Sequence, residues 1–184
     1  MRSPDSSPKM PSMTTMSLAT RTLASSRNSS PGIDITDVAS VKEFFNQAGS
    51  FYAIVAALGS APFVYLKDAD IEYFQAGFNN KLHGQINLVM HGLDHLADGG
   101  SFTLITGILT QQTVEKSVVA STFNAGLEAF TYAASTDIPR GIRIKTVSPN
   151  VVEESLDTYG AFFPFFEPVR AQSVANSLSA PPMA

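Results

Sequence analysis

Two histidines, His91 and His95, stand four residues apart with Asp94 between them. On a helix this spacing places both rings on one face, where they could bind a metal ion. The glutamate of the His-Glu-x-x-His metalloprotease motif is missing, and the sequence offers no evident third ligand. We therefore expect an exposed helix face and no metal site.

Three carboxylates, Asp68, Asp70 and Glu72, form a second cluster of potentially reactive groups. They lie at the expected start of a long helix, where carboxylates cap free backbone N–H groups and interact favourably with the helix dipole. We interpret them as capping residues. The chain contains no cysteine, which excludes thiol catalysis, disulfides and thiolate-bound metals.

Charge and hydropathy narrow the range of partners and locations. Net charge is −4, and acidic residues predominate beyond the basic first 31 residues, which argues against a nucleic acid partner. No apolar stretch approaches the length of about 20 residues that a membrane span requires, so we expect no membrane association and a cytoplasmic location. The alternative is an organelle-targeted protein, because a basic, Ser-rich N-terminus resembles a transit peptide.

The elements that must position functional groups lie between residues 32 and 176. Residues 1–31 are rich in Ser, Thr and Pro without periodicity, so we expect them to be disordered, and we expect residues 177–184 to form a flexible tail. Short apolar runs bounded by Gly or Pro predict four strands, at residues 32–36, 51–58, 101–106 and 142–147.

Helical patterns separate these strands. One helix is expected after Ser40 as its N-cap, and another within residues 117–135. Between them, an apolar repeat from Phe74 to Leu96 predicts a long amphipathic helix that ends at Gly99-Gly100. In all three, apolar residues recur at spacings of three and four. Alternating strands and helices predict an α/β fold with a doubly wound parallel sheet of the Rossmann type. Such a sheet gathers functional residues at its carboxyl edge.

Five blocks of sequence, in order, are similar to successive blocks of the short-chain dehydrogenase/reductase family. These blocks are Asp34–Asp37, Ala53–Gly59, Gly100–Gly107, Gly126–Phe130 and Pro139–Pro149. The chain resembles the small bacterial-type members of the family, cut short at both ends. The resemblance implies an NAD(P)-dependent oxidoreductase acting on a small carbonyl or alcohol substrate, with NADP or NAD as cofactor and assembly into a homo-oligomer through the two long helices.

The resemblance also places residues at the cofactor. Arg27 stands where NADP-preferring members carry a basic residue that can pair with a 2′-phosphate. Asp34 and Ile35 match the positions that flank the adenine. The remaining positions matched to the cofactor site are Ala56, Gly59, Pro149 and Val152.

One part of the usual cofactor site has no counterpart. The family begins with a strand and a glycine-rich turn whose amides hold the pyrophosphate, whereas the first glycine in this chain is Gly32. The sheet is therefore expected to be incomplete. Without a first strand, the edge of Ala53–Leu58 is expected to be unpaired and apolar, and open to aggregation or to pairing with a partner.

The usual catalytic residues are also replaced. The serine position is Gly107, the tyrosine position Ala120, the lysine position Asn124 and the asparagine position Lys81. We hypothesise that Lys81, Thr106 and Asn124 face one cleft, with Lys81 as a cationic acid or oxyanion partner and Thr106 as a hydrogen-bond donor. The alternative is that these residues are structural, and that the chain is a non-redox member acting as a binding or interaction module or as a cofactor-free enzyme.

A dense aromatic segment follows the last predicted strand, with phenylalanines at 162, 163, 165 and 166 around Pro164. In the family this region covers the substrate, so the resemblance implies an apolar lid. Core packing and a surface for a partner are the alternatives.

Overall fold

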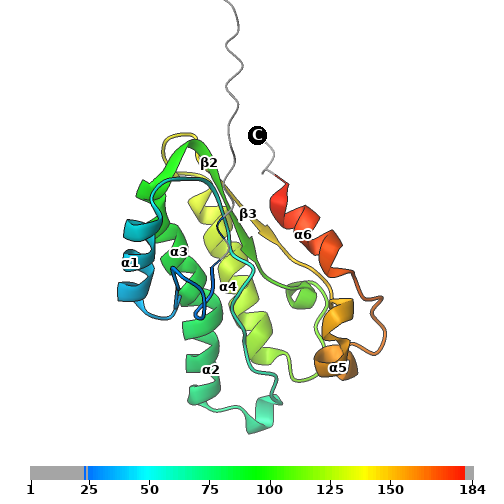
Figure 1. Ribbon diagram of the computed structural model, residues 1–184. Coiled ribbons are helices and arrows are strands. Elements are labelled where there is room, and N and C mark those ends of the chain that lie inside the picture. Colours follow the sequence, from blue (N-terminus) through cyan, green and yellow to red (C-terminus); the bar gives the residue numbers. More distant parts are fainter. Residues whose placement is uncertain (1–22, 24, 181–184) are drawn as a thin grey trace, which may run out of the picture.

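Three parallel strands form the sheet around which the described part of the chain is built (Figure 1). They are β1 (Phe51–Val55), β2 (Leu96–Ile105) and β3 (Arg143–Val147), in the order β1-β2-β3. The computed structural model describes residues 23 and 25–180. The disorder predicted for residues 1–22 and 24, and the end of the predicted tail at 181–184, lie outside the described residues.

One face of the sheet carries the main core. Ile54, Phe102 and Ile144 lie side by side across the three strands, because the strand register pairs Ile54 with Phe102 and Phe102 with Ile144. All three belong to one cluster with Leu88 and Leu127, and Phe102 is completely buried. Side chains alternate between the two faces of a strand, so Lys145 points to the other face, where its ammonium group donates to the carbonyl of Ser177.

Helices cover that core face, and the last described helix lies against β2 and β3 on the face to which Lys145 points (Figure 1). Within the described residues the α-helices are α1 (Val38–Ala48), α2 (Ile71–Gly77), α3 (Gly84–Gly92), α4 (Val118–Ala134), α5 (Leu156–Tyr159) and α6 (Ala171–Ser179). Single 3₁₀ turns occur at Leu66–Asp68, Leu93–His95, Ile108–Thr110, Glu153–Ser155 and Gly160–Phe162. No helix of this described part is both long and apolar enough to cross a lipid bilayer.

The predicted long helix is interrupted. Between α2 and α3 the chain forms a π-helical segment, η2 (Phe78–His83), whose wider turn is closed by the bond from the Gly84 N–H to the Asn79 carbonyl. The helical stretch then ends near His95, earlier than predicted, and β2 begins at Leu96. Asp70 caps the start of α2 by accepting from the N–H groups of Glu72 and Tyr73, as predicted.

The predicted strand at residues 32–36 is wrong, because this segment is a loop. Its backbone groups find partners within the loop and in α1: Ile33 donates to the Ser26 carbonyl, and Asp34 donates to the Ser40 hydroxyl at 2.9 Å. Ser40 is therefore not the N-cap of α1. Asp37 is the N-cap, and its carboxylate accepts from the N–H of Ala39.

Strand β1 lies at an edge of the sheet and pairs, within the described residues, with β2 alone. The unpaired edge predicted from the sequence is confirmed at this position. Tyr52 and Val55 are exposed there. Beside this edge Leu23, Ile33 and side chains of α1 line an apolar groove of about 100 Å³.

We expect Gly92→Ala to destabilise the fold, because Gly92 lies where α3 crosses the sheet. A Cβ at this position would stand 2.8 Å from the Phe45 ring and 2.8 Å from Ile54 Cδ1. Forcing a methyl group into a packed core costs about 1–3 kcal/mol. Chemical denaturation measures the loss. Gly126→Ala on α4 is the matched control, since its Cβ would meet only the end of Leu82 at 3.3 Å and stability should hold or rise.

Candidate functional site

A cleft of about 340 Å³ opens at the carboxyl ends of the three strands. Gly59 follows β1, Thr106 follows β2, and Pro149 and Val152 follow β3, and all four residues line the cleft. Carboxyl ends of parallel strands meet at one edge of a sheet, which explains why residues so distant in sequence converge here.

Lys81 brings an amino group into this cleft from the helical layer. It lies on η2 and is only 8% exposed, and its Nζ donates to the carbonyl of Thr106 at 3.4 Å. No carboxylate of the described residues forms an ion pair with it. Burial lowers the pKa of Lys81 from its ordinary value of 10.5 to about 8, because the charged form is poorly solvated there.

Asn124 reaches the same cleft from α4. It is 4% exposed, and its Oδ1 is buried without a hydrogen-bond partner among the described residues. A Cβ on Gly107 would stand 3.2 Å from the amide nitrogen of Asn124, so the glycine leaves room for this amide. Ala120, one turn earlier on α4, also lines the cleft. The four positions matched to the family's catalytic residues therefore converge on one cavity.

Thr106 is held by a residue to which the sequence assigned no role. Its hydroxyl donates to Oε1 of Glu128 at 3.1 Å, and the same oxygen accepts from the hydroxyls of Thr110 at 3.0 Å and Ser148 at 3.3 Å. The Thr106 hydroxyl is therefore engaged as a donor to Glu128. Glu128 follows Asn124 by four residues on a predicted helix, and that spacing was a signal that both face the same side.

A second unpredicted residue, Gln85, fixes the helical layer to the sheet. This fully buried side chain accepts from the Ile105 N–H at 3.0 Å and donates to the Ile105 carbonyl at 2.9 Å. It also lies 3.5 Å from the carbonyl of Lys81, one turn earlier. The end of β2 and the segment that carries Lys81 are thereby held together.

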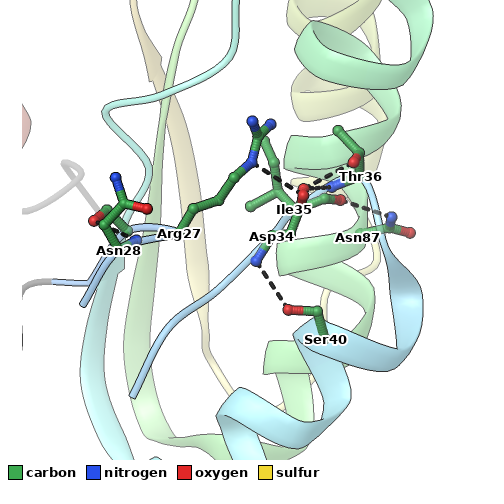
Figure 2. Close-up of polar contacts among 8 residues, drawn as sticks. Arg27, Asn28, Asp34, Ile35, Thr36, Ser40 and Asn87 are labelled. Atoms are coloured by element: carbon green, nitrogen blue, oxygen red, sulfur yellow. Dashed lines mark hydrogen bonds and ion pairs between the residues drawn. The ribbon is translucent and has the colours of Figure 1, made fainter. Parts of the chain in front are cut away.

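The residues expected around the adenine gather at a separate place, shown in Figure 2. Arg27 pairs with Asp34, with 3.0 Å between Nε and the carboxylate. Hydrogen bonds from the Thr36 hydroxyl and N–H, together with the charge of Arg27, hold the pKa of Asp34 below its ordinary value. The carbonyl of Ile35 accepts from Asn87 of α3 at 3.2 Å, which ties this loop to the core.

A groove of about 590 Å³ connects the two places. Arg27 and Ile35 line its far end, and Gly59 and Ser60 line both the groove and the cleft. Ala56, which the sequence also placed at the cofactor, is completely buried in the core and lines neither cavity. Its N–H donates to the Thr103 carbonyl and extends the β1–β2 ladder.

Aromatic side chains form the outer rim of the cleft. Phe63, Tyr159 and Phe163 line it, and Phe63 stacks on Phe162 with ring centres 4.8 Å apart. The aromatic segment predicted as a lid therefore contributes only part of its side chains to the rim of the cleft, and its Phe165 is almost fully exposed. Tyr159 supplies a phenol that the sequence comparison missed, because it comes from α5 and not from the helix where the family carries its tyrosine.

Both histidines of the long helical stretch are half-buried, so the face that carries them is less exposed than expected, and His95 has a structural role. His95 stacks on Phe45 and its Nδ1 lies 3.2 Å from the Gly49 carbonyl. No group of three or more potential metal ligands occurs among the described residues.

A family model described as enoyl-(acyl carrier protein) reductase matches residues 14–181 of the chain. The chain is also similar to an uncharacterised oxidoreductase of Methylorubrum extorquens, with 27% identity over 122 residues. That match covers 65% of this chain and 49% of the relative, so the chain spans about half the length of the curated relative.

Solved structures share the fold. The crystal structure of the protein lin1944 from Listeria innocua is 44% identical, with a TM-score of 0.81, covering 83% of this chain and 77% of that one. A small-chain dehydrogenase is 27% identical, with a TM-score of 0.71, over 80% of this chain and 72% of that chain. Another, solved in complex with NADPH, is 24% identical with a TM-score of 0.70, over 82% and 77%, respectively, and shows a common fold.

We expect Gln85→Met to destabilise the protein by about 2–5 kcal/mol, because it leaves the N–H and carbonyl of Ile105 buried without partners. Gln75→Met on the exposed surface of α2 is the matched control and should change stability by less than about 0.5 kcal/mol. Urea denaturation of both variants tests the difference. Equal midpoints would show that the amide contacts contribute nothing.

We expect Lys81→Met to stabilise the protein at pH 7 by on the order of 1–3 kcal/mol, since it removes a buried charge. Between the folded pKa of about 8 and the ordinary value of 10.5, the unfolded state binds more protons, so the wild type gains stability as pH rises through this window. The advantage of the variant should therefore shrink by pH 10. Denaturation at both pH values measures it, with the exposed Lys42→Met as control. An advantage that is the same at both values would contradict a buried, shifted lysine.

Proposed function

Because the chain belongs to the short-chain dehydrogenase/reductase family, we propose that it is an NAD(P)-dependent oxidoreductase of a small carbonyl or alcohol, working with an atypical set of catalytic residues. The observation that carries the proposal is geometric. Lys81, Thr106 and Asn124 line one cleft at the carboxyl edge of the sheet, and that cleft continues into a groove that ends at Arg27.

The groove and the cleft fit the two ends of a dinucleotide. Arg27 keeps a guanidinium at the groove end, where it can pair with a 2′-phosphate, and Ile35 offers an apolar surface for an adenine. Gly59 permits close backbone approach in the middle, since its φ of 92° is one that glycine adopts readily. Pro149 and Val152 line the nicotinamide end. A small-chain dehydrogenase of the same fold was solved with NADPH, which supports this placement.

Bound NAD(P) would supply or accept the hydride, and the chain's own residues would handle the oxygen of the substrate. The ammonium form of Lys81 can donate a proton or a hydrogen bond to that oxygen inside a cleft that is poorly solvated. The amide of Asn124 lines the same cleft and can orient the substrate. Thr106 contributes through its carbonyl, which holds the Lys81 ammonium, while Glu128 engages its hydroxyl.

A non-redox role is the second candidate, and one observation favours it. The positions matched to the family's tyrosine and lysine are Ala120 and Asn124, so the described cleft lacks the usual pair. In this case the cleft would bind a small molecule or carry out a step that needs no nucleotide.

We further propose a cytoplasmic location and self-association through the helical layer of η2, α3 and α4. Of the small residues in that layer, Gly84 packs within the chain against Ile35, whereas Ala125 is exposed on α4 and is available for contact with a second copy.

We expect NADPH to raise the thermal midpoint of the protein saturably, because a ligand that binds the folded state alone stabilises it. Arg27→Leu should weaken NADPH binding by about 10–100-fold, the loss of one or two charge-assisted hydrogen bonds, and leave NADH binding unchanged. Cofactor fluorescence titration measures both affinities.

Arg170→Leu is the matched control, because Arg170 is exposed near the start of α6 and lines neither cavity. An absent response to either nucleotide at millimolar concentration would reject the oxidoreductase and favour the non-redox alternative. An equal effect of Arg27→Leu on both nucleotides would remove Arg27 from the 2′-phosphate.

A further inference from the structure

We propose that Lys81 is also a nucleophile, which condenses with an apolar aldehyde or ketone in the cleft to form an imine without any nucleotide. This chemistry goes beyond hydride transfer, and it uses the amine in its neutral form. It depends on the cleft and on Lys81, and not on Arg27 or the groove.

The first support is the environment of the amine. An amine-based nucleophile must lose its proton and must not be locked in an ion pair. Lys81 lines the cleft, and among the described residues its ammonium group forms one hydrogen bond, to the carbonyl of Thr106 at the long distance of 3.4 Å. Glu128, the carboxylate that holds the Thr106 hydroxyl, is occupied by three hydroxyl groups. Burial also keeps the pKa of Lys81 at about 8, so a useful fraction is neutral near pH 7.5.

The second support is the lining of the cavity. Among the described residues that line the cleft, Lys81 is the only one charged near neutral pH. Ile108, Leu109 and Val151 form apolar walls, and the rings of Phe63 and Phe163 stand at the rim. Such a lining favours an uncharged apolar carbonyl compound, because a carboxylate on the compound would pair with the Lys81 ammonium and hold the amine in the protonated form, which cannot attack a carbonyl.

The third support is space at the point of reaction. The position matched to the family's tyrosine is Ala120 and the one matched to its serine is Gly107, so two bulky or polar groups are absent beside Lys81. The remaining cavity of about 340 Å³ exceeds what a single aromatic aldehyde fills. The phenol of Tyr159 lies at the same cleft and is the other titratable group of its lining.

The reaction balances without an external oxidant or reductant. The Nζ lone pair of Lys81 attacks the carbonyl carbon, the C–N bond forms and the C–O π electrons move to oxygen. A proton passes from nitrogen to this oxygen. Protonation of the resulting hydroxyl lets it leave as water when the nitrogen lone pair forms the C=N bond, and a second nitrogen proton returns to solvent. The net change is amine plus carbonyl to imine plus water.

The test is reductive trapping of the full chain with benzaldehyde and sodium cyanoborohydride at pH 8, with no nucleotide present. We expect a benzyl group on Lys81 before one appears on an exposed lysine, located by peptide mapping. At this pH an amine with a pKa of about 8 has roughly a hundredfold more neutral form than an ordinary lysine. Lys42, an exposed lysine of α1, is the internal comparison. Glyoxylate in place of benzaldehyde should trap Lys81 at least about tenfold more slowly relative to the N-terminal amine.

Three results would overturn the proposal: labelling of Lys81 no faster than that of Lys42, the same relative rate on Lys81 in the unfolded chain in denaturant, or no preference for benzaldehyde over glyoxylate. The Lys81→Met variant should lose the fast adduct, and Lys42→Met should keep it. Since the readout is a covalent mass on the wild-type chain, it does not depend on a variant that folds. It is also separate from nucleotide binding, so either proposal can fail alone.

Discussion

The double hydrogen bond between the Gln85 side chain and the backbone of Ile105 is the constraint on which the cleft depends. β2 extends beyond the last pair that β1 offers, Val55 with Thr103, so both polar groups of Ile105 on that side lack a strand to pair with. The buried amide of Gln85 takes the place of that missing strand, because a primary amide carries an acceptor oxygen and a donor NH2 group side by side, and these match the N–H and the carbonyl of Ile105. It thereby sets the distance between the sheet and the helical segment that carries Lys81.

The functional character of the cleft comes from one face of α4. Ala120, Asn124 and Glu128 follow one another at spacings of four, so a single helix presents a small side chain and an amide to the cavity, and a carboxylate to the hydroxyl groups behind it. The amide and the carboxylate each have a complementary partner on the sheet side. Gly107 makes room for the amide, and Thr106 donates to the carboxylate. The small side chain of Ala120 and the amine of Lys81 therefore belong to the same cavity.

The sequence predicted the parallel sheet and most helices because their signals are local. Apolar runs located all three observed strands, and α4 lies within its predicted bounds. The loop at residues 32–36 resembled a strand because Ile33 and Ile35 alternate, but both are buried by contacts with the core, which no local pattern reveals. The resemblance to the family predicted that Lys81 and Asn124 face one cleft, and both line it. Gln85 was missed, since a buried polar side chain on a helix has no signature until its partner is placed. Glu128 was missed although its spacing of four from Asn124 places both on one side of the helix.

The π-helical segment η2 corresponds to a recognisable pattern in the sequence. Four apolar residues follow one another at intervals of four positions: Phe74, Phe78, Leu82 and Ile86. On a regular α-helix, which has about 3.6 residues per turn, these side chains would drift around the axis instead of keeping to one face. A π turn corresponds to an α-helix with one residue added, so the loss of a single codon within this stretch would rotate the preceding helix by about 100°. The Gly77 contact with Phe123 would then be lost, although Gln85 could hold its place. Related genes that differ by one codon here should therefore encode clefts with different chemistry, even where their sheets superimpose.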